Sequence, residues 1–221
     1  MESNKMKREL LSVVTIAALT TTPFAFASEE SDGVTVEGNV ALASDYIWRG
    51  QTQTLNEAAI SGGFDLGLDS GIYLGVWGSN VDFGANDNVE IDYYGGVAGE
   101  FSAVGYDLGY IDYNYPGGSG DFEEWYLGLS STVSDLELGV TFSFGVDNAA
   151  DNVEASVATE LSDVGVGLTF GDYDNAGKYT SLAISKELAG VELSLTWSDF
   201  DADAGTASDQ DDVTFAIAKS F

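Results

Sequence analysis

The chain has 221 residues and a formal net charge of −30, because 37 acidic residues stand against 7 basic ones. It contains no histidine and no cysteine. These absences exclude Ser-His triads, histidine or thiolate metal sites, cysteine nucleophiles and disulfides. A chain this acidic also lacks the basic surface that nucleic acids require. We therefore expect no enzyme, no cofactor and no nucleic-acid partner.

The first 27 residues resemble a secretory signal peptide. Lys5, Lys7 and Arg8 precede an apolar stretch over residues 10–19, and a small-x-small cleavage triplet ends at Ala27. The apolar stretch is too short to span a membrane as a helix. The alternative is a buried amphipathic helix of the mature fold. We expect export, with residues 1–27 removed and residues 28–221 folding as one domain.

From residue 34 onward, apolar residues alternate with small or polar ones. Leu136, Leu138 and Val140, for example, are separated by Glu137 and Gly139. Such a period of two, sustained over segments of about ten residues, is typical of membrane barrels. The pattern predicts an all-β fold, a transmembrane up-and-down antiparallel β-barrel of about 12 strands. The expected strands are residues 34–49, 58–69, 72–81, 89–100, 106–115, 122–130, 136–144, 153–161, 164–171, 179–186, 191–197 and 213–221.

The links between these strands alternate in length, short on one side and longer on the other. Short periplasmic turns and longer outer loops are typical of outer-membrane barrels, whose apolar face contacts lipid while the polar face lines the lumen. The alternative is a soluble sandwich or lipocalin-like barrel with its apolar face inward. The alternation over residues 106–115 and 122–130 is too irregular to assign the facing of those two strands. The expected outer loops are residues 50–57, 82–88, 116–121, 146–152, 172–178 and 198–211.

Aromatic residues near the upper ends of the outward faces predict a girdle at the extracellular interface. The girdle candidates are Tyr46, Trp48, Phe144, Phe170 and Trp197.

The last expected strand ends on an aromatic residue with no turn after it. Such a strand pairs with the first strand or leaves an exposed edge, and pairing closes the barrel. We expect its residues Phe215, Ile217 and Phe221 to act as an assembly signal.

Several motifs occur in the first half of the mature chain. They are residues 44–54 (SDYIWRGQTQT), 75–81 (GVWGSNV) and 91–96 (IDYYGG), followed by matches within 110–117 and at 122–124. With these motifs the chain resembles the TorF-type porins, a bacterial family of conserved hypothetical outer-membrane proteins. The second half matches only in its alternation. The resemblance implies an outer-membrane barrel and a porin role, and it implies no substrate and no catalytic residue.

Arg49 is the one arginine after residue 27, and its parity places it inward near the outer rim. Asp45 shares that face, while Glu90 and Asp92 on the fourth strand are candidate partners. An arginine that faces carboxylates at a constriction would sort solutes by charge. The alternative is a structural ion pair that braces the barrel wall. Small inward residues on later strands leave space for a narrow pore.

Many acidic residues fall in the expected outer loops, where they either attract cations to the mouth or keep the surface soluble. Asp199, Asp201 and Asp203 loosely resemble a calcium-binding loop. The glycine, however, comes one place late, and Gln210 stands where the loop needs a bidentate glutamate. Solvated loop charge is the favoured interpretation, and loose divalent-cation binding beside lipopolysaccharide is the alternative.

These patterns predict an exported barrel of the bacterial outer membrane that acts as a narrow channel for passive diffusion of small solutes or cations. Its expected partners are outer-membrane lipid, lipopolysaccharide, the barrel-assembly machinery and divalent cations. One alternative is a non-conducting surface or scaffold protein with acidic ion-binding loops. Another is a lipid-acting barrel enzyme that uses a serine or an aspartate without histidine. The solute and the oligomeric state stay open.

Overall fold

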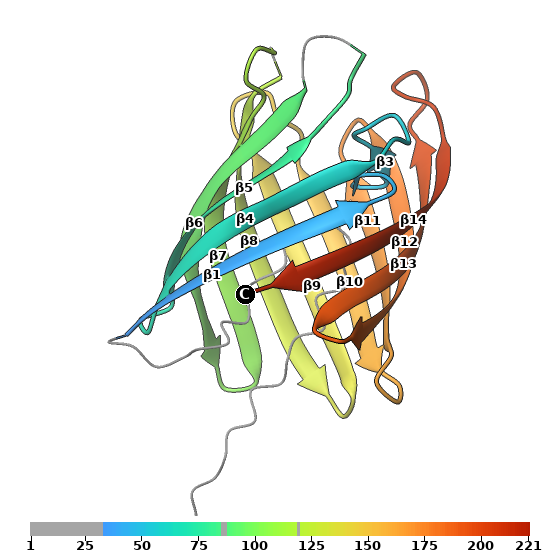
Figure 1. Cartoon of the computed structure of the whole chain (residues 1–221). Helices are drawn as coiled ribbons and strands as arrows, with labels where there is room; N and C mark the ends of the chain where they lie inside the picture. The colour runs from blue at the N-terminus through green and yellow to red at the C-terminus, as the bar shows by residue number, and fades with distance from the viewer. Residues whose placement is uncertain (1–32, 85–87, 119) are drawn as a thin grey trace, which may run out of the picture.

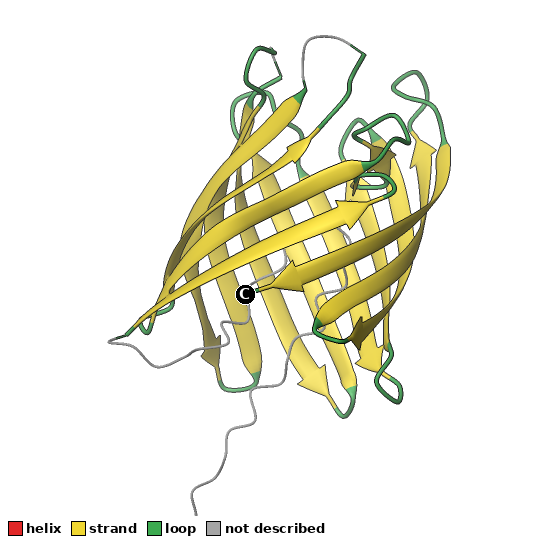
Figure 2. Cartoon of the chain, in the orientation of Figure 1, coloured by secondary structure: helices red, strands yellow, loops and turns green. Residues whose placement is uncertain are grey.

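Twelve antiparallel strands close into a single barrel, in which strands adjacent in sequence are adjacent in the sheet (Figures 1 and 2). The structure, a computed structural model, describes residues 33–84, 88–118 and 120–221. Within these ranges, no helix has the length and hydropathy of a membrane span. The prediction of an all-β, up-and-down barrel of twelve strands is confirmed. The expected leader, residues 1–27, lies outside the described residues and stays a prediction.

The wall strands have bounds close to those expected from the alternation. A small two-stranded hairpin, β2 (Ile47–Trp48) with β3 (Gln51–Thr52), is separate from the wall. The wall consists of β1 (Val34–Ala43), β4 (Ala59–Leu68), β5 (Ile72–Asn80), β6 (Val89–Phe101), β7 (Val104–Asn114), β8 (Phe122–Val133), β9 (Leu136–Gly145), β10 (Asn152–Glu160), β11 (Gly165–Tyr173), β12 (Gly177–Leu188), β13 (Val191–Ala202) and β14 (Gln210–Ser220).

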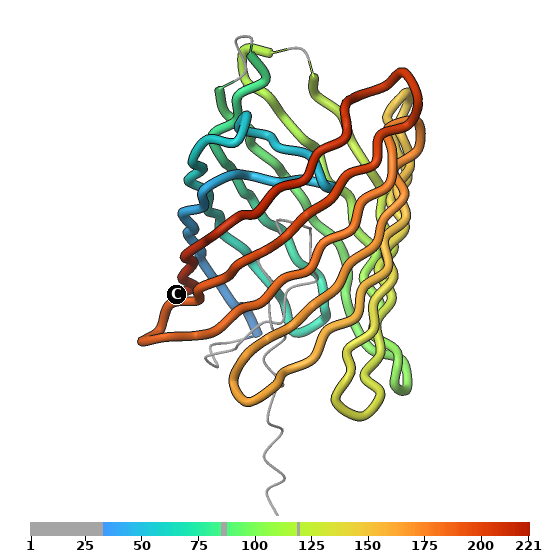
Figure 3. The backbone as a smooth tube through the Cα atoms, turned by 90° about the vertical axis from the view of Figure 1, so that its right-hand side faces the viewer, coloured from blue at the N-terminus to red at the C-terminus, as the bar shows by residue number. Residues whose placement is uncertain are grey.

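The barrel closes where the last strand meets the first, as the terminal alternation predicts. β1 pairs with β14 from Asn39 opposite Ser220 to Ala43 opposite Ala216. Beyond the strand, the backbone groups of Gly38 and Phe221 exchange two hydrogen bonds of 2.9 Å. The closure leaves no free strand edge between β1 and β14. Figure 3 shows the continuous wall from the side of the late strands.

The two ends of the barrel differ. At the end where β1 begins and β14 finishes, tight turns join the strands, such as Ala189 and Gly190 between β12 and β13. Both residues have positive φ, 55° and 78°, which suits a two-residue hairpin whose twist matches that of the strands. The other end carries most of the longer connections. Because β11 runs to Tyr173 and β13 to Ala202, the loops expected at 172–178 and 198–211 are shorter than predicted.

The apolar face of the wall points outward. Leu138 and Phe142 on β9 are 41% and 37% exposed, whereas their neighbour Ser143 is 6% exposed. The exposures fix the facing of the two unassigned strands: Leu108 on β7 and Trp125 on β8 are 48% and 53% exposed on the outer face, while Ile111 and Tyr126 are buried on the inner face at 2% and 7%. The soluble alternative, with a dry apolar interior made by the alternating residues, is wrong for this structure.

The first expected strand, residues 34–49, is the main error of the sequence prediction. β1 ends at Ala43, and the chain bends at Ser44 and Asp45. It then reverses at Arg49 and Gly50, which have φ values of 47° and 79°. The alternation continues through this stretch, but the backbone leaves the wall, so parity no longer tells which side a residue faces.

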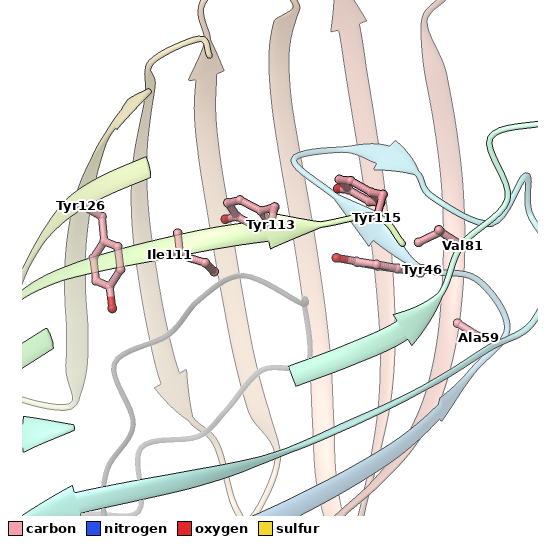
Figure 4. Packing of buried hydrophobic residues seen from close by; sticks show 7 residues of the cluster. All are labelled: Tyr46, Ala59, Val81, Ile111, Tyr113, Tyr115 and Tyr126. Carbon is pink, nitrogen blue, oxygen red and sulfur yellow. The ribbon is translucent and has the colours of Figure 1, made fainter. Parts of the chain in front are cut away.

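A cluster of buried residues lies inside the barrel, close to the end with the longer connections (Figure 4). Four of its members are tyrosines, which come from the segment after β1, from β7 and its end, and from β8. The cluster is formed by Tyr46, Ala59, Val81, Ile111, Tyr113, Tyr115 and Tyr126. One sector of the lumen is therefore filled with side chains.

Candidate pore constriction

Residues 44–58 fold into the barrel mouth, and we name them the inner loop. The carboxylate of Asp45 organises this loop. Its Oδ1 accepts hydrogen bonds from the hydroxyls of Thr52 (2.8 Å) and Thr54 (2.6 Å). The backbone N–H of Thr52 donates to Oε1 of Gln210 on β14 at 2.9 Å. Asp45 therefore stabilises the loop through these hydroxyls, and Arg49 pairs with another carboxylate.

The loop reaches across the lumen to the opposite wall. Arg49 donates from both terminal nitrogens to Glu124 on β8, at 2.7 Å each. The two residues are 7% and 1% exposed, and the guanidinium lies 4.2 Å from the Trp48 ring centroid and 4.8 Å from that of Tyr173. Burial opposes the charge, but the bonds to Glu124 outweigh it, so the pKa of Arg49 rises above its ordinary value.

Gly50 allows the tip of the inner loop to approach the inner faces of two strands close to the C-terminus. A Cβ at this position would lie 2.6 Å from Cβ of Tyr179 and 3.2 Å from Cβ of Phe200. Tyr179 on β12 and Phe200 on β13 are themselves buried at 4% and 0% exposure. Only glycine, which also accepts the positive φ, fits this contact.

Two residues predicted for the outer aromatic girdle are in the interior. Tyr46 is 2% exposed and packs edge-on against Trp77 at 5.4 Å between ring centroids. Trp48 contacts Tyr113 at 5.8 Å and Tyr173 at 5.5 Å. Both predictions are wrong, because the chain has left the wall after Ala43 and turned inward.

Glu90 and Asp92 on β6 do face the lumen. The hydroxyl of Tyr46 donates to Oε1 of Glu90 at 3.2 Å, so Glu90 contacts the inner loop. Arg49 pairs with Glu124 rather than with either of them. The four predicted lumen residues therefore lie at three separate places. Asp45 is at the base of the inner loop, Arg49 is paired with Glu124, and Glu90 and Asp92 lie together on β6.

The opposite sector of the lumen is more open. Apart from Glu137, Glu154 and Tyr179, many inward positions on β9–β12 carry small groups, and Ser156 on β10 is exposed although it points inward between Gly139 and Thr169. Where this sector meets the inner loop, a small cavity is lined by Trp48, Arg49, Tyr113, Thr141, Ser143, Asn152 and Glu154. This cavity places Arg49 and Glu154 at the boundary between the inner loop and the more open sector.

Several tyrosines lie across a glycine on the next strand. Tyr94 faces Gly75, Tyr126 faces Gly109 and Tyr179 faces Gly171 in register. A Cβ on each glycine would lie within 2.2 Å of the tyrosine ring. The aromatic ring thus covers a position that has no side chain of its own.

The remaining girdle candidates are on the outer surface. Phe144, Phe170 and Trp197 are 50%, 51% and 38% exposed. Tyr110 and Trp125, which the sequence analysis did not select, continue the row beside Phe144, with 4.9 Å between the rings of the first two. The sequence pattern could have identified Tyr110 and Trp125 as girdle candidates only if the facing of β7 and β8 had been known. The girdle role itself stays a prediction.

The assembly-signal residues Phe215, Ile217 and Phe221 are exposed on the outer face, and their recognition stays a prediction. The loose calcium motif is not formed: Asp199 and Asp201 belong to β13, while Asp203 lies beyond it. Among the described residues, no three acidic side chains gather as a metal site.

Comparison with solved structures shows the same fold at very low sequence identity. A structure described as the KdgM porin has a TM-score of 0.60 and 7% identity, over 84% of this chain and 97% of that one. The NanC porin gives 0.53 and 10%, over 83% and 98%. Outer membrane phospholipase A from Escherichia coli gives 0.52 and 10%, over 83% and 91%. These likenesses concern the barrel alone.

No curated protein sequence matches the chain. A family does match, over residues 27–221, and its description is "Bacterial protein of unknown function (Gcw_chp)". This description does not carry the TorF name, so that closer resemblance stays an interpretation of the motifs. The chain belongs to the Gcw_chp family of bacterial proteins.

Proposed function

We propose that the chain is a bacterial outer-membrane barrel that acts as a narrow diffusion channel favouring cations, with the inner loop as its constriction. The observation that carries the proposal is the two-sided wall. Apolar side chains such as Leu138 are exposed outside, while Ser156 is exposed inside. Such a wall fits lipid on its outer face and water within.

The charges that face the lumen support a preference for cations. Half-buried glutamates occupy inward positions on four strands, whereas Arg49 is the one inward cation among the described residues and is paired with Glu124. The three lysines in the described ranges are exposed. Carboxylates along a narrow aqueous route raise the local cation concentration. These half-buried inward glutamates are Glu37, Glu137, Glu154 and Glu192.

Single-channel recording in planar bilayers tests this function. We expect small, discrete conductance steps from the folded chain and, under a salt gradient, a reversal potential of the sign for cation flow. Folding is verified beforehand by heat-dependent migration on gels. An absence of steps from folded protein would refute the channel, and an anion-directed reversal potential would refute the electrostatic part.

One observation favours a second candidate, a non-conducting surface barrel. The inner loop packs tightly inside the barrel. Its residue Tyr46 is 2% exposed, and Phe200 on β13 and Glu124 on β8, which lie beside the loop, are 0% and 1% exposed. A seal of this kind would stop solutes while the acidic loops remain available for ions or lipopolysaccharide. Absence of conductance in the intact chain, together with conductance after removal of the inner loop, would support this candidate.

A further inference from the structure

Two carboxylates on β6 lie inside the barrel without a positive partner among the described residues. Glu90 and Asp92 are 1% and 5% exposed. Oε2 of Glu90 and Oδ1 of Asp92 accept no hydrogen bond from the part of the chain that the structure describes. Buried carboxylates in proteins are paired, neutralised or bound to a metal, because an unpaired buried charge is costly. This pair therefore needs a charge-compensating group.

The surroundings of the pair supply oxygen atoms. Two residues apart on one strand, Glu90 and Asp92 share the inward face, and Asp92 is opposite Trp77 on β5 and Tyr113 on β7. The Tyr46 hydroxyl is 3.2 Å from Oε1 of Glu90, and Tyr115 lies against the same carboxylate. Figure 4 shows the hydroxyl ends of Tyr46 and Tyr115 on the same side of the cluster.

The cations of the described residues are engaged elsewhere. Arg49 is bound to Glu124. Lys178 is exposed and 3.6 Å from Asp172, and the other two described lysines, Lys186 and Lys219, are also exposed. The compensating charge must then come from outside the described residues or from a proton.

We propose that Glu90 and Asp92 bind a hard divalent cation of the Ca²⁺ type, with the hydroxyls of Tyr46 and Tyr115 beside it. Oxygen donors alone suit Ca²⁺ and Mg²⁺, and Ca²⁺ accepts the less regular geometry. A charge of +2 balances the two carboxylates. No third acid joins them within the described ranges, so hydroxyl or water oxygens complete the shell.

The site has a structural consequence for the constriction. Tyr46 belongs to the inner loop and contacts Glu90 on the wall. A cation held at Glu90 and Asp92 stabilises this contact and with it the position of the loop. The inference does not depend on conduction, because binding is measured on folded protein in detergent micelles.

Calcium titration of the full folded chain tests the site. Starting from chelator-treated protein, we expect calorimetry with CaCl₂ to detect one saturable site per chain and a thermal midpoint that rises with Ca²⁺. Glu90→Gln or Asp92→Asn should weaken this binding by at least about tenfold, the loss that even an outer-shell change causes at a metal site. Both substitutions keep the shape of the side chain.

The matched control is Asp201→Asn with Asp203→Asn, which removes acidic groups at the outer rim and should leave the saturable site intact. In chelator, Glu90→Gln should be at least as stable as the unaltered chain, since it removes a buried charge. Equal Ca²⁺ binding by the unaltered chain and Glu90→Gln would overturn the proposal. So would the absence of any saturable site, which would leave a shared proton as the compensating charge. Ca²⁺ binding without conductance would instead refute the channel alone.

Discussion

Arg49 makes contacts that bear on both of the roles that the sequence left open, the structural ion pair and the charge filter. Its guanidinium is a structural partner of Glu124, with two bonds of 2.7 Å, and it also lines the small cavity beside Glu154. The alternation predicted that Arg49 faces the lumen, and Arg49 does lie inside the barrel. It belongs to the inner loop, however, and not to a strand of the wall. Glu124 was not selected, because the sequence offered no way to align β8 with a loop 75 residues earlier.

Breaking the Arg49–Glu124 pair should be more costly than replacing it. Arg49→Met leaves a buried carboxylate unpaired, and we expect a loss of about 3–5 kcal/mol in the free energy of unfolding. The double variant Arg49→Met/Glu124→Leu should recover most of this loss, because apolar groups of similar size replace a buried ion pair at little cost. Urea unfolding in micelles, followed by tryptophan fluorescence, measures both. Strictly additive losses would contradict a buried, coupled pair.

Glu154 is the residue through which we expect charge selection to act. It borders the cavity beside Arg49, and its carboxylate accepts a hydrogen bond of 2.8 Å from Tyr179. Glu154→Gln retains the shape of the side chain but removes a negative charge from the cavity beside Arg49, so the cation preference should fall. The reversal potential under a salt gradient measures this change. Asp209→Asn at the outer rim is the control and should change the reversal potential less. An equal change would indicate that charge selection acts at the mouth of the barrel.

At the level of elements, the sequence predicted the wall well and the inner loop poorly. Alternation reports which residues share a face, and it located all twelve wall strands. It cannot report where a strand leaves the sheet, because residues 44–49 continue the pattern with the same period. The available signal was local: Arg49-Gly50 as a turn and Thr52 and Thr54 as hydroxyl donors to Asp45. Pairing across the lumen depends on tertiary contacts that no short segment encodes.

The inner loop should set the conductance without being needed for the barrel. β2 and β3 pair with each other and are not strands of the wall, so replacing residues 47–52 with a Gly-Ser linker, combined with Glu124→Gln to avoid an unpaired buried carboxylate, should preserve folding. We expect the single-channel conductance to rise at least about twofold, since the interior width limits the conducting area. The same replacement over residues 203–208, between β13 and β14, is the control. An unchanged conductance in the first variant would show that the loop does not narrow the route.

For the whole molecule, the distribution of polarity follows from which solvent meets each face. The acidic composition places carboxylates inside and at the rim, while the outer face keeps residues such as Phe64 and Leu74, which are 60% and 62% exposed. A soluble barrel would have the opposite arrangement. Comparison with solved porins agrees in the fold, and the assignment of a channel depends on the interior of this chain.

Substitutions at two neighbouring positions, whose side chains point to opposite sides of the wall, test this arrangement directly. Leu138 points outward and Ser156 inward, and they lie one register step apart on β9 and β10. Leu138→Arg should destabilise the barrel in lipid by about 2–4 kcal/mol, because it places a charge in the hydrocarbon layer. Ser156→Arg should cost little stability, since its side chain enters the open sector, but should reduce both conductance and cation preference. Unfolding in vesicles and single-channel recording measure the two effects. If Ser156→Arg destabilises as strongly as Leu138→Arg, the interior is dry, and water does not fill the barrel.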